Sequence, residues 1–284
     1  MIHYVKRQDL DIEKYDDCIE KSVQSRIYAF SWYLDIVAEN WDVLVLDDYK
    51  AVMPIPWRKK YGIKYVSQPH FCQQLGIFSK VEISNDLQLK FINKIPLKFL
   101  KVSLNLNSEN LLISKKSELL NYLLDISNEY STIQKSFSKG RKHAIKVGEK
   151  LDLKLQKTTL KNLIDIQNKF YKYKIPKEKL LHLESVSLQK ENGIVLGVFK
   201  NGVLLGGGFF IKSKDRIIYL YSAFSEEGRS LQTASFLISR VIKQNVNSNL
   251  ILDFEGGNMP NIGRFYRSFG AKEENYSVFN RTLL

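Results

Sequence analysis

Hydrophobic positions in the second half of the chain follow two different spacings, one typical of strands and one of helices. Short apolar runs bounded by Gly, Asn, Asp and Ser predict strands, and two of these runs are joined by Asn201-Gly202, a two-residue signal for a β-hairpin. The expected strands are residues 194–200, 203–211, 216–223, 250–254 and 276–280.

Apolar side chains that recur every three or four residues predict the helices of the same half. Pro176 separates the first two helices, because proline interrupts a helix interior. The resulting order of helix, helix, three antiparallel strands, helix, strand, helix and strand is mixed α/β, unlike a regular βαβ repeat. The expected helices are residues 159–173, 177–190, 231–242 and 261–269.

The first half has a looser version of this order. Its expected elements are helices over residues 15–39 and 85–94 and strands over 42–46, 50–56, 64–67, 99–106 and 119–126. A chain of 284 residues exceeds the usual size of one domain. We therefore expect two related α/β domains, residues 1–135 and 151–284, joined by a basic helix over 136–150.

Composition adds that the protein is globular and has no obvious metal site. Hydrophobic residues make up 44% and charged residues 26%. The two cysteines and four histidines lack metal-ligand spacing, so no metal is predicted. The N-terminus lacks the apolar core of a signal peptide, and no apolar run approaches the roughly 18 residues that span a bilayer. We expect a cytoplasmic protein without a transmembrane segment.

Positive charge is concentrated in one segment. Residues 135–161 contain nine Lys or Arg and two acids, a local charge of +7 out of a net +13. Such a field attracts polyanions, although a Lys-rich solvated face is the plainer alternative. Arg141, Lys142 and Lys146 are the candidate phosphate contacts. Helical spacing turns Arg141 toward the packed side.

The last predicted helix carries a motif of a known family. Residues 261–271, Asn-Ile-Gly-Arg-Phe-Tyr-Arg-Ser-Phe-Gly-Ala, resemble the late helix of GNAT-type N-acyltransferases, with Tyr266 and Gly270 on the family's tyrosine and glycine. Residues 136–151 and 253–257 resemble segments of the FemABX-like group, whose chains hold two GNAT-like domains. This resemblance implies two tandem GNAT-like domains and an aminoacyltransferase related to those that build peptidoglycan bridges.

One departure from the GNAT pattern bears on the acyl donor. GNAT enzymes hold the coenzyme A pyrophosphate on a glycine-rich loop that opens a helix. The corresponding loop here, Ser225-Glu226-Glu227-Gly228-Arg229-Ser230, lacks the leading basic residue and the last glycine, and its two glutamates oppose an anion. The FemABX-like resemblance implies aminoacyl-tRNA as donor in place of acyl-coenzyme A, and the basic segment suits tRNA or a nucleotide-linked acceptor.

The implied reaction moves an aminoacyl or acyl group onto an amine of an anionic acceptor, either nucleotide-linked or a cell-wall precursor. Asp253 and Glu255, two apart at a strand end, are candidate proton acceptors for the amine. The resemblance gives Tyr266 the role of protonating the leaving group. The resemblance places Tyr221 and Ser222 where a GNAT sheet splays to admit substrate, which makes the backbone there the candidate oxyanion contact. The plainer alternatives are salt-bridged carboxylates and a packing tyrosine.

Several further residues are weaker candidates. Arg264 and Arg267 are second choices for contacts with the anionic substrate. The loop residues His70, Gln73 and Gln74 could line the opposite wall of a cleft between the halves, although a structural loop is the plainer reading. Three consecutive glycines, residues 206–208, predict a bulge or the close approach of a ligand within a strand.

Two other functions remain open. One is an N-acyltransferase that uses acetyl- or acyl-coenzyme A through a degenerate phosphate loop. The other is a non-catalytic protein of the same fold that binds polyanions, whose binding would weaken steeply with salt. Fold alone does not choose between them.

Overall fold

The described residues, 1–110, 118–171 and 174–283 of a computed structural model, fall into two units. One unit combines Met1–Leu120 with Glu274–Leu284, and the other is Asn121–Glu273. This division differs from the expected boundaries at residues 135 and 150. The basic helix lies inside the second unit, because the strand before it already belongs to that unit's sheet. The C-terminal strand returns to the first unit.

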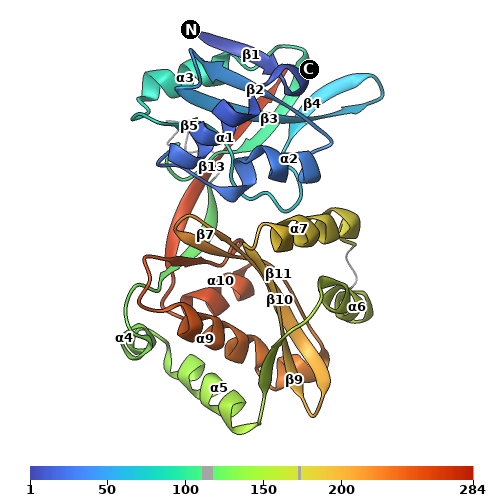
Figure 1. Ribbon diagram of the computed structural model, residues 1–284, viewed down its shortest axis with the longest axis vertical. Helices are drawn as coiled ribbons and strands as arrows, with labels where there is room; N and C mark the ends of the chain where they lie inside the picture. The colour runs from blue at the N-terminus through green and yellow to red at the C-terminus, as the bar shows by residue number, and fades with distance from the viewer. Residues whose placement is uncertain (111–117, 172–173, 284) are drawn as a thin grey trace. The chain divides into compact units, whose positions relative to one another are not determined.

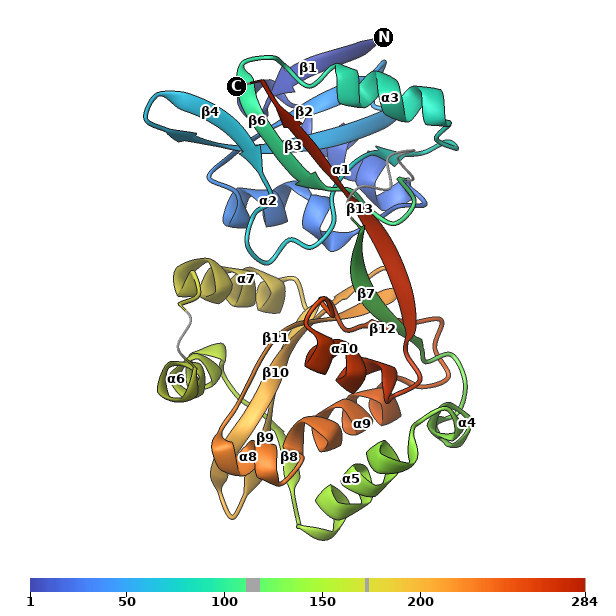
Figure 2. The same ribbon diagram turned by 180° about the vertical axis from the view of Figure 1, so that it is seen from behind.

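The first unit is built on a mixed sheet with strand order β1-β2-β3-β4-β6-β13 (Figures 1 and 2). Neighbouring strands are antiparallel except for β4 and β6, which are parallel. The short strand β5 pairs with β3. The elements are β1 (Ile2–Lys6), α1 (Ile12–Lys21), α2 (Ser31–Val37), β2 (Asn40–Leu46), β3 (Ala51–Lys60), β4 (Ile63–Ser67), β5 (Phe78–Ser79), α3 (Asn85–Asn93), β6 (Phe99–Asn105) and β13 (Lys272–Thr282).

The single long helix expected over residues 15–39 is wrong, because the chain breaks between α1 and α2. Helix α1 ends before Ser22, whose hydroxyl donates to the Ile19 carbonyl at 2.8 Å. A 3-10 turn follows, and the buried Tyr15 hydroxyl donates to the Ala29 carbonyl within it at 2.6 Å. These bonds stabilise the break, which local apolar spacing does not reveal.

The second unit has a sheet with strand order β7-β12-β11-β10-β9-β8, and only β11 and β12 are parallel. Helices α6 and α7 lie on one side of β9–β11, and α9 and α10 lie on the other (Figures 1 and 2). The elements are β7 (Glu118–Asp125), α4 (Tyr130–Lys135), α5 (Lys139–Lys150), β8 (Lys154–Lys157), α6 (Leu160–Phe170), α7 (Lys177–Gln189), β9 (Gly193–Lys200), β10 (Val203–Ser213), β11 (Arg216–Phe224), α8 (Glu226–Ser230), α9 (Thr233–Asn245), β12 (Ile251–Asp253) and α10 (Pro260–Arg267).

Both units therefore repeat one topology, and the expectation of two mixed α/β, GNAT-like domains is confirmed. In each, a run of antiparallel strands is followed by one parallel pair and a last antiparallel strand. The origin of that last strand was not expected. Strand β13, from the end of the sequence, pairs with β6 in the first unit, and β7 pairs with β12 in the second.

Local signals in the second half are largely confirmed. Asn201 and Gly202 both have positive φ, at 50° and 78°, as the hairpin between β9 and β10 requires. The glycine run sits at a bulge, since the β9–β10 register shifts between Leu204 and Gly206. A Cβ on Gly207 would lie 2.1 Å from the Leu196 carbonyl oxygen, so close strand packing requires glycine there. The expected helix over 159–173 is α6, and residues 172–173 lie outside the described residues.

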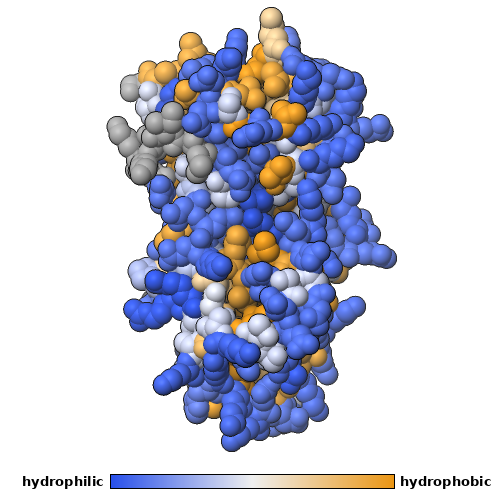
Figure 3. Space-filling model, turned by 90° about the vertical axis from the view of Figure 1, so that its left-hand side faces the viewer, coloured by the Kyte–Doolittle hydropathy of each residue, from blue (hydrophilic) through white to orange (hydrophobic). Residues whose placement is uncertain are grey.

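Apolar side chains of both units pack inside, and the face of the molecule in Figure 3 is mostly hydrophilic with small hydrophobic clusters. Cys18 and Cys72 are both buried and unbridged. Within the described ranges, no helix combines the length and the apolar character that crossing a membrane requires.

Candidate functional site

The candidate site is a pocket of about 380 Å³ in the second unit, where β11 and β12 part. These strands pair only from Arg216 to Ile218 on β11 and from Ile251 to Asp253 on β12. Beyond this point β11 continues to Phe224, whereas the other strand turns away. The lining residues are Tyr219, Leu220, Tyr221, Ser222, Phe254, Glu255, Gly256, Gly257, Asn258, Met259, Ile262 and Tyr266.

Asp253 anchors the loop on one side of this pocket. It is 1% exposed, and its Oδ2 accepts from Arg216 Nη1 at 2.8 Å. Its Oδ1 accepts from Asn121 Nδ2 and from the backbone N–H of Glu255, both at 3.0 Å. Asp253 is not among the residues that line the pocket, and its role as proton acceptor stays a prediction. Its position instead fixes the backbone at Glu255.

Glu255 begins a turn that carries the chain from β12 to α10. Glu255, Gly256 and Gly257 all have positive φ, at 50°, 57° and 124°. Left-handed backbone is costly for residues with a Cβ, so the two glycines suit this turn and Glu255 adopts a strained conformation. Such strain is typical of functional sites whose surroundings hold the residue in place. The carboxyl-bearing Glu255 is half-buried on the pocket wall.

Tyr266 lines the same pocket from α10. The helix starts with Pro260 in its first turn and is followed by Gly270 with φ of 77°. The Tyr266 ring stacks on Phe254, with centroids 4.6 Å apart and planes at 24°. Burial raises the pKa of the Tyr266 hydroxyl above its usual range, and the negative charges of Glu255 and Asp253 raise it further. Tyr266 is therefore protonated at neutral pH.

Tyr221 and Ser222 line the strand side of the pocket, together with Tyr219, which sequence reasoning missed. The Tyr219 ring stacks on Phe210 at 4.9 Å. Burial, followed by the nearby Tyr266, raises the pKa of Tyr219, while a hydrogen bond with Ser222 acts in the opposite direction. Because β12 leaves at Asp253, the edge of β11 beyond Ile218 faces the pocket without pairing to that strand.

Arg141 does not line the pocket; it holds α5 against α9 and α10. Its Nε donates to the Ser268 hydroxyl at 2.8 Å, and its Nη1 donates to the Ser235 hydroxyl. The guanidinium carbon lies 4.2 Å and 4.6 Å from the ring centroids of Phe265 and Phe269. Burial lowers the pKa of Arg141 to about 10. These contacts give Arg141 a packing role outside the pocket, where it braces the helix that carries the candidate tyrosine, and its contact with phosphate stays a prediction.

The other basic candidates lie on helix surfaces and outside the lining of this pocket. Lys142 donates from Nζ to the Lys135 carbonyl at 3.1 Å, and Lys146 is exposed on the same helix. Arg264 is exposed on α10. Arg267 pairs with Glu273 at 3.7 Å, with both side chains about half exposed. The structure therefore separates a basic helix face from the tyrosine-lined pocket.

The loop candidates belong to the first unit. Gln74 is fully buried and donates to Glu274 Oε2 at 3.0 Å and to Gln73 Oε1 at 3.1 Å. His70 is exposed, and its ring lies 6.4 Å from that of Phe71. Gln74 thus has a structural role in its own unit.

The loop that would receive a coenzyme A pyrophosphate is closed by its own side chain. The Ser225 hydroxyl accepts from the Gly228 backbone N–H at 3.0 Å and donates to the Leu205 carbonyl, also at 3.0 Å. Glu226 and Glu227 occupy the first turn of α8. The amide that would bind phosphate is therefore capped, and carboxylates flank it. Among the described residues, no group of three or more His, Cys, Asp or Glu could hold a metal ion.

Comparison with known proteins identifies the fold. No protein-family model matches the sequence, and no curated protein matches it. The solved structure of FemX matches with a TM-score of 0.70 at 9% identity, over 94% of this chain and 95% of that chain. A tandem GNAT protein from the clavulanic acid biosynthesis pathway matches with a TM-score of 0.55 at 9% identity, over 99% of this chain and 98% of that chain.

A third solved structure, L-PGS from Bacillus licheniformis, gives a TM-score of 0.55 at 10% identity, over 96% of this chain and 92% of that chain. Identities this low support a statement about fold and nothing finer. The expected resemblance is confirmed at that level: the chain has the tandem GNAT-like fold seen in FemX.

Proposed function

We propose that the protein is an aminoacyl- or acyltransferase whose reaction takes place in the pocket between β11 and β12. The observation that carries the proposal is that Tyr266 and Glu255 line one pocket together with Tyr221 and Ser222 of β11. Backbone N–H groups of a strand that lines a pocket suit an oxyanion, because they are fixed in place before the reaction. The FemX-like fold supports this chemistry by analogy.

The proposed step conserves protons. A neutral amine attacks the carbonyl carbon of the acyl donor, and a C–N bond forms while the bond to the leaving oxygen breaks. Glu255 accepts the proton that the nitrogen loses, and Tyr266 gives a proton to the leaving oxygen. Proton exchange with solvent then restores both side chains. The raised pKa of Tyr266 keeps it in the form that can donate.

Two observations favour an oxygen ester such as aminoacyl-tRNA over a coenzyme A thioester as donor. The capped, acidic loop at residues 225–230 offers a poor site for pyrophosphate. The raised pKa of Tyr266 also makes it a weak acid toward a thiolate, whose conjugate thiol has a pKa of about 8.5. A ribose alkoxide is a stronger base than a thiolate, so it is the better proton acceptor of the two for Tyr266.

The exposed basic face of α5 is the proposed contact for the phosphates of a tRNA donor. Lys139, Lys146 and Lys150 are exposed there, and Ile145 and Gly148 turn the other face inward. Lysines placed this way provide sequence-independent, salt-sensitive attraction to a phosphate backbone. For the acceptor we propose an amine on an anionic molecule, either a nucleotide-linked compound or a cell-wall precursor.

The decisive experiment is a transfer assay with tRNA charged with radiolabelled amino acids and a nucleotide-linked peptidoglycan precursor as acceptor. We expect Tyr266→Phe to slow transfer by about 100-fold or more, which is the usual contribution of a general acid. Glu255→Gln should lower the rate at neutral pH as well. Tyr61→Phe is the matched control, because Tyr61 is 91% exposed at a turn of the first unit and does not line the pocket.

Other outcomes would select the alternative functions. Tight, saturable binding of acetyl-coenzyme A with transfer from it would replace the proposed donor. Salt-sensitive tRNA binding without transfer, unchanged by Tyr266→Phe and Glu255→Gln, would identify a non-catalytic polyanion-binding protein.

A further inference from the structure

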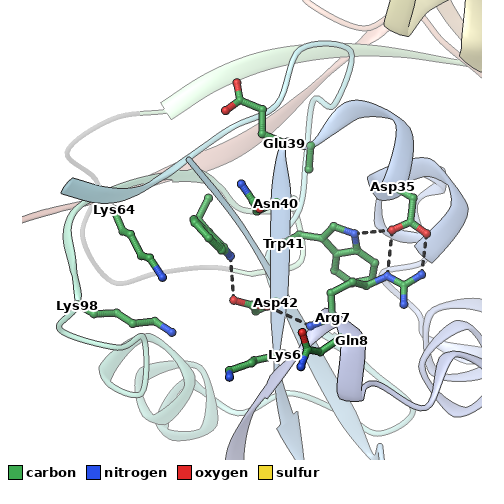
Figure 4. A pocket seen from close by; sticks show the side chains of 12 residues that line it. Lys6, Arg7, Gln8, Asp35, Glu39, Asn40, Trp41, Asp42, Lys64 and Lys98 are labelled. Atoms are coloured by element: carbon green, nitrogen blue, oxygen red, sulfur yellow. Dashed lines mark hydrogen bonds and ion pairs between the residues drawn. The ribbon is translucent and has the colours of Figure 1, made fainter. Parts of the chain in front are cut away.

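A second pocket, of about 430 Å³, is lined entirely by residues of the first unit. It lies where β1 ends and β2 begins (Figure 4). Lys6, Lys64 and Lys98 reach it from three different segments, and their ammonium groups point into the same space beside Asp42 (Figure 4). This pocket has no part in the proposed transferase site.

Asp42 fixes the aromatic rings of the pocket. It is 7% exposed, and its Oδ2 accepts from Trp57 Nε1 at 2.8 Å and from the Tyr4 hydroxyl. Its Oδ1 accepts from the backbone N–H of Arg7 at 3.0 Å. A buried carboxylate with three donors holds its partners firmly, so Trp57 and Tyr4 have defined positions.

The fixed rings in turn position two lysines. The Lys64 ammonium lies 4.6 Å from the ring centroid of Trp57. The Lys98 ammonium lies 4.2 Å from the ring centroid of Tyr4 and 5.2 Å from that of Phe99. Cation–π contacts at these distances hold the ammonium groups while leaving their N–H donors available. The lysine arrangement is thus built into the unit.

The acidic residues of the pocket are engaged by other groups. Asp35 accepts two bonds from Arg7, at 2.9 and 2.7 Å, and one from Trp41 Nε1 at 2.8 Å. Glu39 pairs with Arg58 at 3.3 Å. No ion pair found among the described residues engages the three lysines, which leaves an excess of positive charge around Asp42.

This crowding of like charges has an energetic consequence. Burial lowers the pKa of Lys98, and the positive charges of Lys64 and Lys6 lower it as well, while Asp42 acts in the opposite direction. The three like charges repel one another, which is a cost to stability set against the ring contacts and the Asp42 carboxylate. An anion placed among them would remove that cost.

We propose that this pocket binds the phosphate or pyrophosphate group of a small anionic molecule. Ammonium groups bind phosphate oxygens as compact point charges, and three of them converging from separate segments match a multiply charged anion. The volume is within the usual range for small-molecule sites, so the pocket accommodates more than a lone phosphate. The inference rests on the first unit alone and stands whether or not the transferase proposal holds.

Titration calorimetry with inorganic pyrophosphate tests the site on the whole chain. We expect saturable binding that Lys98→Met and Lys64→Met each weaken by roughly ten- to hundred-fold, the effect of losing one charge-assisted contact. Methionine preserves the aliphatic stem and its packing on the rings. Lys94→Met, on an exposed lysine at the end of α3 and outside the pocket, is the control and should bind as the parent does.

Absence of pyrophosphate binding, or binding that Lys98→Met and Lys64→Met leave unchanged, would overturn the proposal. Melting temperatures provide a second readout. Removing a crowded charge should leave the melting temperature unchanged or raised, and a marked fall in either variant would show a structural lysine instead. Titration with a nucleoside diphosphate and sedimentation with phosphatidylglycerol vesicles then distinguish a soluble phosphate ligand from a lipid headgroup.

Discussion

The carboxylate of Glu274 offers a sharp test of what holds the C-terminal strand in the first unit. Its Oε1 accepts from the Ser108 hydroxyl at 3.0 Å and lies 3.5 Å from Arg26 Nη2, and its Oε2 accepts from Gln74 Nε2 at 3.0 Å. The Glu274 and Arg26 side chains are only 12% and 5% exposed. Glu274→Ala leaves the buried Arg26 guanidinium without this carboxylate and removes one acceptor each from Ser108 and Gln74.

Removing one partner of a buried ion pair costs about 3–5 kcal/mol, because the remaining charge loses its compensation. We expect Glu274→Ala to lower the free energy of unfolding by an amount in this range. With an m value of about 2 kcal/mol/M, the urea midpoint of the first unit should drop by about 2 M. All three tryptophans, at positions 32, 41 and 57, lie in the first unit, so tryptophan fluorescence follows that unit selectively.

The adjacent residue provides the control. Glu273 pairs with Arg267 at 3.7 Å, with side chains 47% and 56% exposed, and accepts from the Tyr122 hydroxyl at 3.2 Å. Glu273 belongs to the second unit and its exposed pair is worth about 1 kcal/mol or less, so Glu273→Ala should leave the tryptophan midpoint of the first unit nearly unchanged. Equal midpoints for Glu273→Ala and Glu274→Ala in the fluorescence transition would refute the reasoning.

Three further predictions concern the rest of the chain. Gly207→Ala should lower the melting temperature strongly, because its Cβ would meet the Leu196 carbonyl, whereas Gly140→Ala on an open helix surface should leave it unchanged or raise it. Arg141→Met should cost about 1–3 kcal/mol in urea unfolding through lost bonds to two serine hydroxyls; an unchanged midpoint would argue against this bracing role. Burial raises the pKa of Cys18 to about 11, so its contribution to stability should be complete below its unfolded pKa of about 8.5 and be lost as pH rises toward 11. A Cys18→Ala variant should show a weaker loss of stability over that alkaline range.

The fold was largely predictable from sequence where local signals were strong. The Asn201-Gly202 turn, the apolar stripe of α9 and the break at Pro176 each specify an element through backbone or packing preferences of a few residues. The break between α1 and α2 was not predictable, because it depends on bonds such as Tyr15 to Ala29. The unit boundaries were missed for a related reason: strand pairing across more than a hundred residues leaves no local pattern.

The candidate site was predictable in part. Tyr221, Ser222, Glu255 and Tyr266 all line one pocket, because residues at a strand end and on the following helix are brought together by the parting of two strands. The basic residues are not in it. A positive segment identifies a charged helix, but only the packing of Arg141 between aromatic rings shows which cation is turned inward.

The return of residues 274–282 to the first unit has a consequence for synthesis on the ribosome. Every other strand that the structure describes in the first unit has emerged by residue 105, yet β6 lacks its β13 partner until residues 278–282 are translated. Strands β7 to β12 of the second unit can pair with one another earlier, because all of them precede residue 254. A nascent chain stalled before residue 274 would therefore present the edge of β6 to its neighbours.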